Sequence, residues 1–226
     1  PHTVRSRTSV AGLMRAGGRG YFLLDVTDPI GSQNEAAAAA RMVVLDTTAG
    51  EDPDIGRITA APVREPAGTW QLARLNNGRW AMVIGNGYGS ERQQAVLLVQ
   101  FLDGRRELLK LPAGQAGGNG LSAARLVDLE GDQSPDIAYA GDLHGQLWKF
   151  DLSGREAEKW KVAADGKPLL LAKDADGTPQ AITAAPWVAP HPRGGRMVVL
   201  GTGRLLGDAG RATASTQSLY GILDAG

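Results

Sequence analysis

The chain has 226 residues, of which 42% are hydrophobic, a composition that allows one large all-β domain and argues against a disordered chain. Its 24 Lys and Arg residues balance its 24 Asp and Glu residues, so no global charge favours nucleic acid or an anionic membrane as a partner. Cysteine is absent, which excludes disulfides, thiol catalysis and cysteine-ligated zinc or iron–sulfur centres. No apolar run approaches the ~20 residues of a membrane span. We therefore expect no direct insertion into a membrane, and we expect any export signal to lie upstream of Pro1.

The N-terminal part of the sequence predicts two strands with a short helix between them. Thirty-one glycines and 12 prolines separate short apolar runs along the chain, which indicates many tight turns and many short strands. The runs at 20–25 and 42–45 have the pattern of the third and fourth strands of the repeat that follows them, so they are interpreted as the second half of an earlier blade. Between them, Ser32 to Glu35 has the form of a capping box and precedes five alanines, which predicts a short helix within residues 28–41 without a chemical role.

One phrase recurs three times, with starts 63 and 61 residues apart. It reads Ile-Thr-Ala-Ala-Pro-Val at 58–63, Leu-Ser-Ala-Ala-Arg-Leu at 121–126 and Ile-Thr-Ala-Ala-Pro-Trp at 182–187. Each copy precedes a second apolar run that ends in glycine, a third that ends in aspartate and, in two copies, a fourth, more polar run. Four short strands per unit are typical of a propeller blade. The phrase is interpreted as the innermost strand, and bends or close approaches are expected at the glycines that end the second strands, which are Gly85, Gly141 and Gly201.

The repeat predicts an all-β fold, a modified β-propeller, complete or incomplete, of four-stranded antiparallel blades. Residues 1–226 are expected to form part of one such domain, with orphan strands at 20–46 and blade-like repeats at about 58–112, 121–163 and 182–226. Three blades and two strands cannot close a ring, because propellers usually have ~4–8 blades. The tryptophans fall at repeat-linked positions and are expected to pack between blades; they are Trp70, Trp80, Trp148, Trp160 and Trp187.

A candidate metal loop occupies residues 128–136, between the first and second runs of the middle repeat. Oxygen-bearing side chains stand at its alternate positions, which are Asp128, Glu130, Asp132, Ser134 and Asp136. This spacing resembles the first nine positions of an EF-hand loop, with position 7 ligating through the Ser134 carbonyl. Four carboxylates would repel one another without a cation, and Ca²⁺ tolerates an irregular oxygen shell better than Mg²⁺ does. Position 6 is Gln133 instead of glycine and position 12 is Tyr139 instead of a bidentate Glu. The alternative is a polar hairpin turn without metal.

The sequence contains few residues that could form a catalytic site. The three histidines, His2, His144 and His191, stand far apart in the sequence, and His144 lies in a segment with the composition of a hairpin tip. The glycine-rich segment 85–89 is followed by no lysine, which disfavours a phosphate-binding loop. The acidic segments 51–54 and 174–177 are interpreted as ordinary turns. We therefore expect that the chain is not an enzyme.

Several long stretches resemble the C-terminal region of the PilY/PilC family. They comprise residues 18–29, 80–88, 136–152 and 182–192, together with 201–204 and 217–222 near the C-terminus. The resemblance implies a modified β-propeller in an exported protein of the outer membrane, cell surface or pilus tip, that is, of the fimbrium. It implies roles in type IV pilus biogenesis, in the balance of pilus extension and retraction, in twitching motility and in adhesion. Minor pilins and host-surface receptors are the implied partners, and the calcium loop of the family corresponds to Asp128, Glu130, Asp132, Ser134 and Asp136.

Two other functions fit part of the sequence. Quinoprotein-type dehydrogenases are propellers whose blades also end in Leu-Tyr/Trp-x-Leu-Asp phrases, but they need a catalytic carboxylate and cofactor-gripping residues for which the sequence offers no convincing set. The other alternative is a metal-free structural scaffold.

Overall fold

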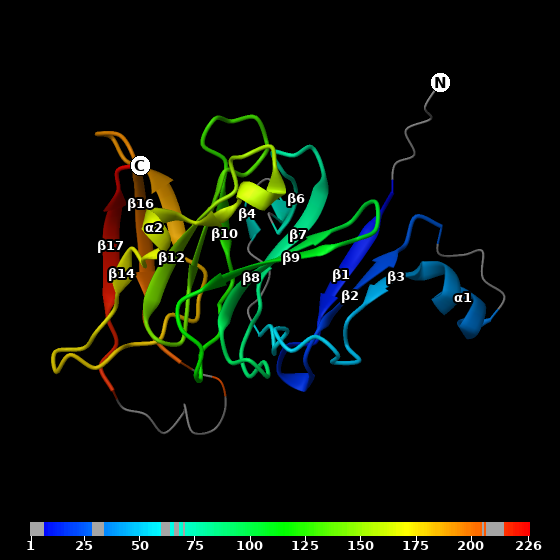
Figure 1. The fold of residues 1–226 in the computed structure, drawn as a ribbon, viewed down its shortest axis with the longest axis horizontal. Coiled ribbons are helices and arrows are strands. Elements are labelled where there is room, and N and C mark those ends of the chain that lie inside the picture. The colour runs from blue at the N-terminus through cyan, green and yellow to red at the C-terminus, as the bar shows by residue number, and fades with distance from the viewer. Residues whose placement is uncertain are drawn as a thin grey trace.

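The computed structural model describes residues 7–28, 34–59, 64–65, 68–69, 71–204, 206 and 215–226. Within these residues the chain forms four antiparallel sheets of three to five strands and one separate two-stranded hairpin. Figure 1 shows the four sheets side by side in chain order, from the first sheet near the N-terminus to the fourth near the C-terminus.

The sheets are built almost entirely from neighbouring strands of the chain. The first sheet consists of β1 (Ser9–Leu13), β2 (Tyr21–Asp25) and β3 (Val43–Asp46). The second consists of β6 (Leu72–Arg74), β7 (Trp80–Gly85), β8 (Ala95–Phe101) and β9 (Leu108–Ala113). The third consists of β10 (Arg125–Val127), β11 (Ile137–Gly141), β12 (Gln146–Asp151) and β13 (Lys161–Val162), with β14 (Leu170–Leu171) also paired to β12. The fourth consists of β15 (Trp187–Pro190), β16 (Arg196–Gly201) and β17 (Leu219–Asp224).

The remaining elements are short. They are the hairpin of β4 (Arg64–Glu65) and β5 (Gly68–Thr69), the helices α1 (Glu35–Met42) and α2 (Ala163–Gly166), and the 3₁₀ turns Arg15–Gly17 and Ala157–Lys159. Asn34 caps α1, because its side-chain oxygen accepts a hydrogen bond from the Ala37 amide at 2.9 Å. No helix in the described part of the chain is both long and apolar enough to span a bilayer.

The middle sheets are apolar on both faces, because each packs between two others. Successive side chains of a strand point to opposite faces. On β7, Ala81 and Val83 therefore pack toward the third sheet, whereas Met82 and Ile84 pack toward the first. This double burial explains why the apolar runs of the second sheet, in β7 and β8, read as continuous hydrophobic stretches.

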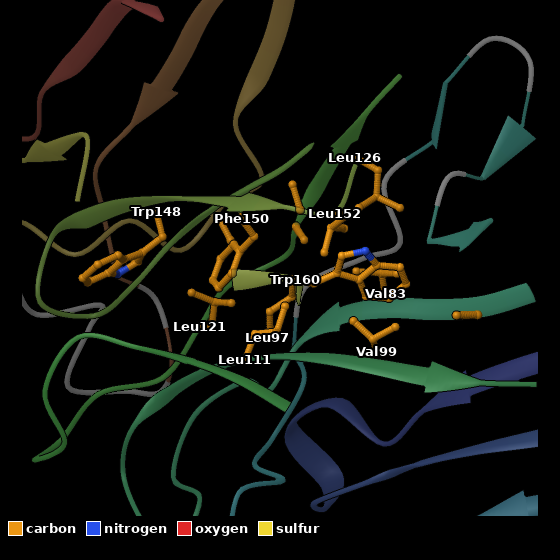
Figure 2. Close-up of a cluster of buried hydrophobic side chains, with 14 of the residues drawn as sticks. Val83, Leu97, Val99, Leu111, Leu121, Leu126, Trp148, Phe150, Leu152 and Trp160 are labelled. Carbon is orange, nitrogen blue, oxygen red and sulfur yellow. The ribbon is translucent and has the colours of Figure 1, made fainter. Parts of the chain in front are cut away.

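Three hydrophobic clusters fill the spaces between consecutive sheets. The largest lies between the second and third sheets and contains Leu97 and Val99 on one side and Trp148 and Phe150 on the other (Figure 2). A second cluster, around Tyr21, Ile84 and Leu98, joins the first sheet to the second. A third, around Tyr139, Ile182 and Leu200, joins the third sheet to the fourth. Each cluster takes side chains from two sheets, so the sheets stabilise one another in sequence.

The recurring phrase is not the innermost strand as predicted, but the segment that leads into it. Strand β10 begins at Arg125 and β15 at Trp187, near the ends of their phrases. The start of the phrase packs on the preceding part of the chain instead, with the Gly87 amide donating to the Leu121 carbonyl at 3.0 Å. In the first copy, residues 60–63 lie outside the described residues, and the first strand of the second sheet follows later, at β6.

The glycines that end the second strands lie where the chain is most crowded. A Cβ built on Gly85 would stand 1.8 Å from the Ser122 carbonyl oxygen, and one on Gly141 would stand 2.2 Å from Ile182 Cγ2. The predicted close approach is therefore confirmed at both positions. At Gly201 a Cβ would meet no atom within 4 Å in the described part of the chain, so no close approach marks the end of that strand.

Gly85→Ala is expected to lower the free energy of unfolding by about 1–3 kcal/mol or more, because the added methyl group collides with backbone that cannot rotate away. Gly201→Ala is the matched control and should change stability by no more than about 0.5 kcal/mol. Urea denaturation of the intact protein measures both. Equal midpoints for the two variants would contradict the proposed contact between Gly85 and the following phrase.

Three other sequence predictions are corrected. The first sheet contains β1 in addition to the two expected strands. The helix begins at Glu35 with Asn34 as its N-cap, whereas Ser32, the expected cap, lies outside the described residues. Trp148 and Trp160 pack between sheets as predicted, but Trp80 and Trp187 are 55% and 57% exposed. Trp70 lies outside the described residues.

Candidate functional site

The candidate metal loop joins β10 to β11, so it connects the first and second strands of the third sheet. The Asp136 amide donates to the Val127 carbonyl at 2.9 Å and closes the loop at its base. Residues 129–133 are exposed, Asp128 and Ser134 are half-buried, and Asp136 is buried. The structure thus places all five predicted ligand residues on one surface loop.

Two of the carboxylates fold the loop backbone. The Asp128 carboxylate accepts hydrogen bonds from the amides of Gly131 at 2.7 Å and Gln133 at 2.8 Å. Asp132 accepts one from the Ser134 amide at 2.8 Å. Gln133 has a φ of 71°, the left-handed conformation that glycine adopts most readily. Position 6 therefore makes the sharp turn that an EF-hand loop makes there, although it is not a glycine.

Asp136 holds the base of the loop from inside. It is 6% exposed, and its carboxylate accepts hydrogen bonds from the Leu129 amide at 2.8 Å and from Asn76 Nδ2 at 3.0 Å. Asn76 belongs to the turn between β6 and β7 of the second sheet, and the same nitrogen lies 3.2 Å from the carbonyl oxygens of Pro135 and Leu152. The loop is therefore fixed to the neighbouring sheet as well as to its own.

Asn76 was not among the predicted site residues. Its signal is the Asn-Asn-Gly sequence at 76–78, which marks a turn between two apolar runs, at the place in the second sheet that the metal loop occupies in the third. This signal predicts that the turn lies beside the loop, but it does not show which of its side chains contacts Asp136.

The loop carries the oxygen-bearing side chains that a calcium site needs, but these side chains do not converge on one point. In the part of the chain that the structure describes, no three His, Cys, Asp or Glu side chains form a group that could hold a metal ion. Glu130 and Asp132 are both exposed, so packing does not fix either side chain. The oxygen ligands, their alternate spacing and the left-handed turn at Gln133 fit Ca²⁺, which prefers carboxylate and carbonyl oxygen.

The other acidic segments have structural roles. Asp174 accepts hydrogen bonds from the amides of Asp176 and Thr178, at 3.0 and 2.8 Å, as in the ordinary turn that was predicted. In the segment 51–54, Asp52 and Asp54 also pair with Lys110, whose Nζ lies 2.7 and 2.8 Å from their carboxylates. These ion pairs, which the sequence did not indicate, attach the segment to β9.

Both described histidines lie in turns. His144 Nε2 lies 2.9 Å from the Gly117 carbonyl oxygen. His191 Nδ1 accepts a hydrogen bond from the Arg193 amide at 3.2 Å. His2 lies outside the described residues.

Comparison with known proteins identifies the family. The sequence model of the PilY1 beta-propeller domain matches residues 3–226. The chain belongs to this family. The all-β propeller fold predicted from the repeat is confirmed, as is the resemblance to the PilY/PilC family.

The relatives are considerably longer than this chain. The type IV pilus biogenesis factor PilY1 of Pseudomonas aeruginosa strain PAO1 is 39% identical over 238 residues, which cover 96% of this chain and 19% of the relative. A PilY1 homolog of Xylella fastidiosa is 34% identical and is covered over 15% of its length. The crystal structure of the Pseudomonas aeruginosa PilY1 C-terminal domain superimposes with a TM-score of 0.81 at 38% identity, over 97% of this chain and 45% of that one. The chain thus spans 15–19% of the length of these relatives and under half of the solved domain.

Proposed function

We propose that this chain is the propeller module of a type IV pilus-associated surface protein that acts in pilus biogenesis. The observation that carries the proposal is the 39% identity to PilY1 across 96% of the chain, because a match of that length covers all four sheets. In this proposal the protein is exported and stands at the cell surface or the pilus tip. It acts in extension and retraction control, twitching motility and adhesion, with minor pilins and host-surface receptors as its partners.

The role we propose is binding and regulation, not catalysis. Support comes from the relatives, which are named as biogenesis factors, and from the use of the acidic and histidine side chains in turns and ion pairs. Loops on rigid sheets are common binding elements, since the sheets hold them in fixed positions.

We further propose that the loop 128–136 binds Ca²⁺ through Asp128, Glu130, Asp132, the Ser134 carbonyl and Asp136. Support comes from the left-handed turn at Gln133 and from the anchoring of Asp136 by Asn76. A bound divalent cation would neutralise the repulsion among four carboxylates and stiffen the loop. A stiffened loop offers partners a surface with fewer conformations, which is how calcium commonly switches a binding surface.

Calcium is expected to raise the melting temperature of the intact protein, and Asp132→Ala is expected to abolish the increase. Binding to the folded state alone stabilises by about 2.7 kcal/mol when the free cation is a hundredfold above its dissociation constant. Asp132 is exposed, so its removal should leave the fold unchanged. Asp176→Ala, in the ordinary turn at 174–177, is the matched control and should keep the full calcium effect.

The same variants separate the pilus proposal from the calcium proposal. A strain whose only copy of the protein carries Asp132→Ala should assemble surface pili but twitch less, whereas a strain that lacks the protein should lose pili. Equal melting temperatures with calcium and with chelator would overturn the calcium proposal, and the protein would then be a metal-free scaffold. Normal piliation without the protein would overturn the role in biogenesis.

A further inference from the structure

A cavity of about 860 Å³ lies between the first and second sheets. Its apolar wall includes Leu23 of β2, Leu72 of β6 and Leu102, which directly follows β8. The volume is within the range of about 300–1,000 Å³ that small-molecule sites occupy. The cavity is separate from the candidate metal loop, since none of its lining residues belongs to residues 128–136.

The indole of Trp80 lines this cavity and is 55% exposed. The rest of β7 after Trp80 is buried, so the exposure is confined to the first residue of the strand. Trp187, which is as exposed, has the guanidinium of Arg125 over its ring at 5.3 Å. Among the described residues no ring or cation covers Trp80 in this way. Trp80 therefore presents an exposed aromatic side chain at the cavity.

Charged groups of both signs surround this surface. Arg7 lies 3.9 Å from Asp25, and Asp103 accepts a hydrogen bond of 2.7 Å from Arg79. Arg106 Nη1 donates to the Val44 carbonyl at 2.9 Å and so holds the β8–β9 turn against β3. The lining residues contribute two arginines, Arg7 and Arg106, and two aspartates, Asp25 and Asp103, so the cavity selects neither an anion nor a cation.

We propose that this cavity binds a neutral saccharide, with one sugar ring stacked on Trp80. A sugar ring has an apolar C–H face that matches an indole, and hydroxyl groups around its edge that both donate and accept. Asp25 and Asp103 accept from such hydroxyls, and Arg7 and Ser9 donate to them. A lipid chain or an apolar peptide would cover these polar side chains without adding a hydrogen bond to them, which is unfavourable for polar groups. The inference goes beyond the pilus and calcium proposals and depends on neither.

The test is binding of the intact protein to immobilised neutral glycans built from glucose, galactose and N-acetylglucosamine. At least one of them is expected to bind, and Trp80→Ala should weaken that binding at least tenfold. Trp187→Ala removes an equally exposed indole outside the cavity and should leave the affinity unchanged. Circular dichroism melting of both variants checks that their folds are intact. Intact folds are expected because both tryptophans are exposed.

A second measurement keeps the proposal falsifiable should Trp80→Ala unfold. Trp80→Phe retains an aromatic face, and Asp103→Asn retains the shape of the side chain while removing its charge. Trp80→Phe should keep part of the affinity, and Asp103→Asn should lower it. Absence of binding to every neutral glycan, or equal binding by Trp80→Ala and Trp187→Ala, would overturn the saccharide site. Selective binding of sialylated glycans or of lipid vesicles would overturn it as well.

Discussion

Asp224→Ala is expected to lower the free energy of unfolding by up to about 3–5 kcal/mol, because it leaves a largely buried lysine without its counter-ion. The Asp224 carboxylate on β17 lies 2.7 Å from Lys149 Nζ on β12 and accepts a hydrogen bond of 2.5 Å from the Tyr139 hydroxyl on β11. The Lys149 and Asp224 side chains are 12% and 9% exposed. These contacts join the third sheet to the fourth.

The comparison with an exposed pair isolates the effect of burial. Asp103→Ala breaks the ion pair with Arg79, in which the Asp103 side chain is 48% exposed and the Arg79 side chain 32%. This substitution should lower the free energy of unfolding by no more than about 1 kcal/mol. The double variant Asp224→Ala, Lys149→Met should recover most of the stability, because no unpaired buried charge remains. Denaturant unfolding of the intact protein measures all three. A cost for Asp224→Ala equal to that of Asp103→Ala would contradict this account.

The same pair gives the stability a defined dependence on pH. Burial alone raises the pKa of Asp224, but the hydrogen bonds and charge of Lys149 and the hydrogen bond from Tyr139 outweigh it and hold the pKa below its ordinary value. The stabilisation is therefore complete above the unfolded-state pKa of about 3.9 and is lost as the pH falls through the folded-state value. Asp224→Asn should remove this part of the acid sensitivity.

The repeat made most of the sheet architecture predictable, because periodic apolar runs report burial directly. The run at 95–103, for example, corresponds to β8 (Ala95–Phe101), a middle strand that is apolar on both faces. Strand β1 was missed because Ser9–Leu13 has no such run. Its Gly12 lies against the ring of Phe22, and a Cβ there would stand 2.1 Å from the ring. A strand that packs through a glycine against an aromatic ring need not contain a long apolar run, so the sequence pattern does not reveal it.

Contacts between residues far apart in the chain could not be predicted from the sequence. Asp224 was visible only as the aspartate that ends an apolar run, whereas its partner Tyr139 lies 85 positions earlier. The exposure of Trp80 and Trp187 was likewise hidden, since each tryptophan stands at the first residue of its strand, where the neighbouring sheet no longer covers it. The candidate metal loop could be located because its five candidate ligands lie within nine consecutive residues, whereas Asn76, which anchors the loop, comes from the preceding sheet.

Trp148→Ala is expected to destabilise the protein by about 3–5 kcal/mol, the usual cost of removing a large aromatic side chain from a core. Trp148 is 2% exposed in the cluster between the second and third sheets (Figure 2). Its indole N–H also donates to Asp142 Oδ2 at 2.9 Å, and Asp142 is fully buried. The substitution therefore removes both apolar packing and a donor to a buried carboxylate.

Two further variants divide this cost into its parts. Trp148→Phe keeps an aromatic ring in the core but removes the N–H donor, so it should cost less than Trp148→Ala and more than the Trp187→Ala control, whose indole is 57% exposed. Asp142 retains hydrogen bonds from Asn119 Nδ2 at 2.9 Å and from the Gln146 amide at 2.8 Å, which limits the loss from the missing donor. Urea midpoints of the intact protein, followed by far-ultraviolet circular dichroism, rank the three variants. If Trp148→Ala were no more destabilising than Trp187→Ala, the cluster between the second and third sheets would not be the core that holds them together.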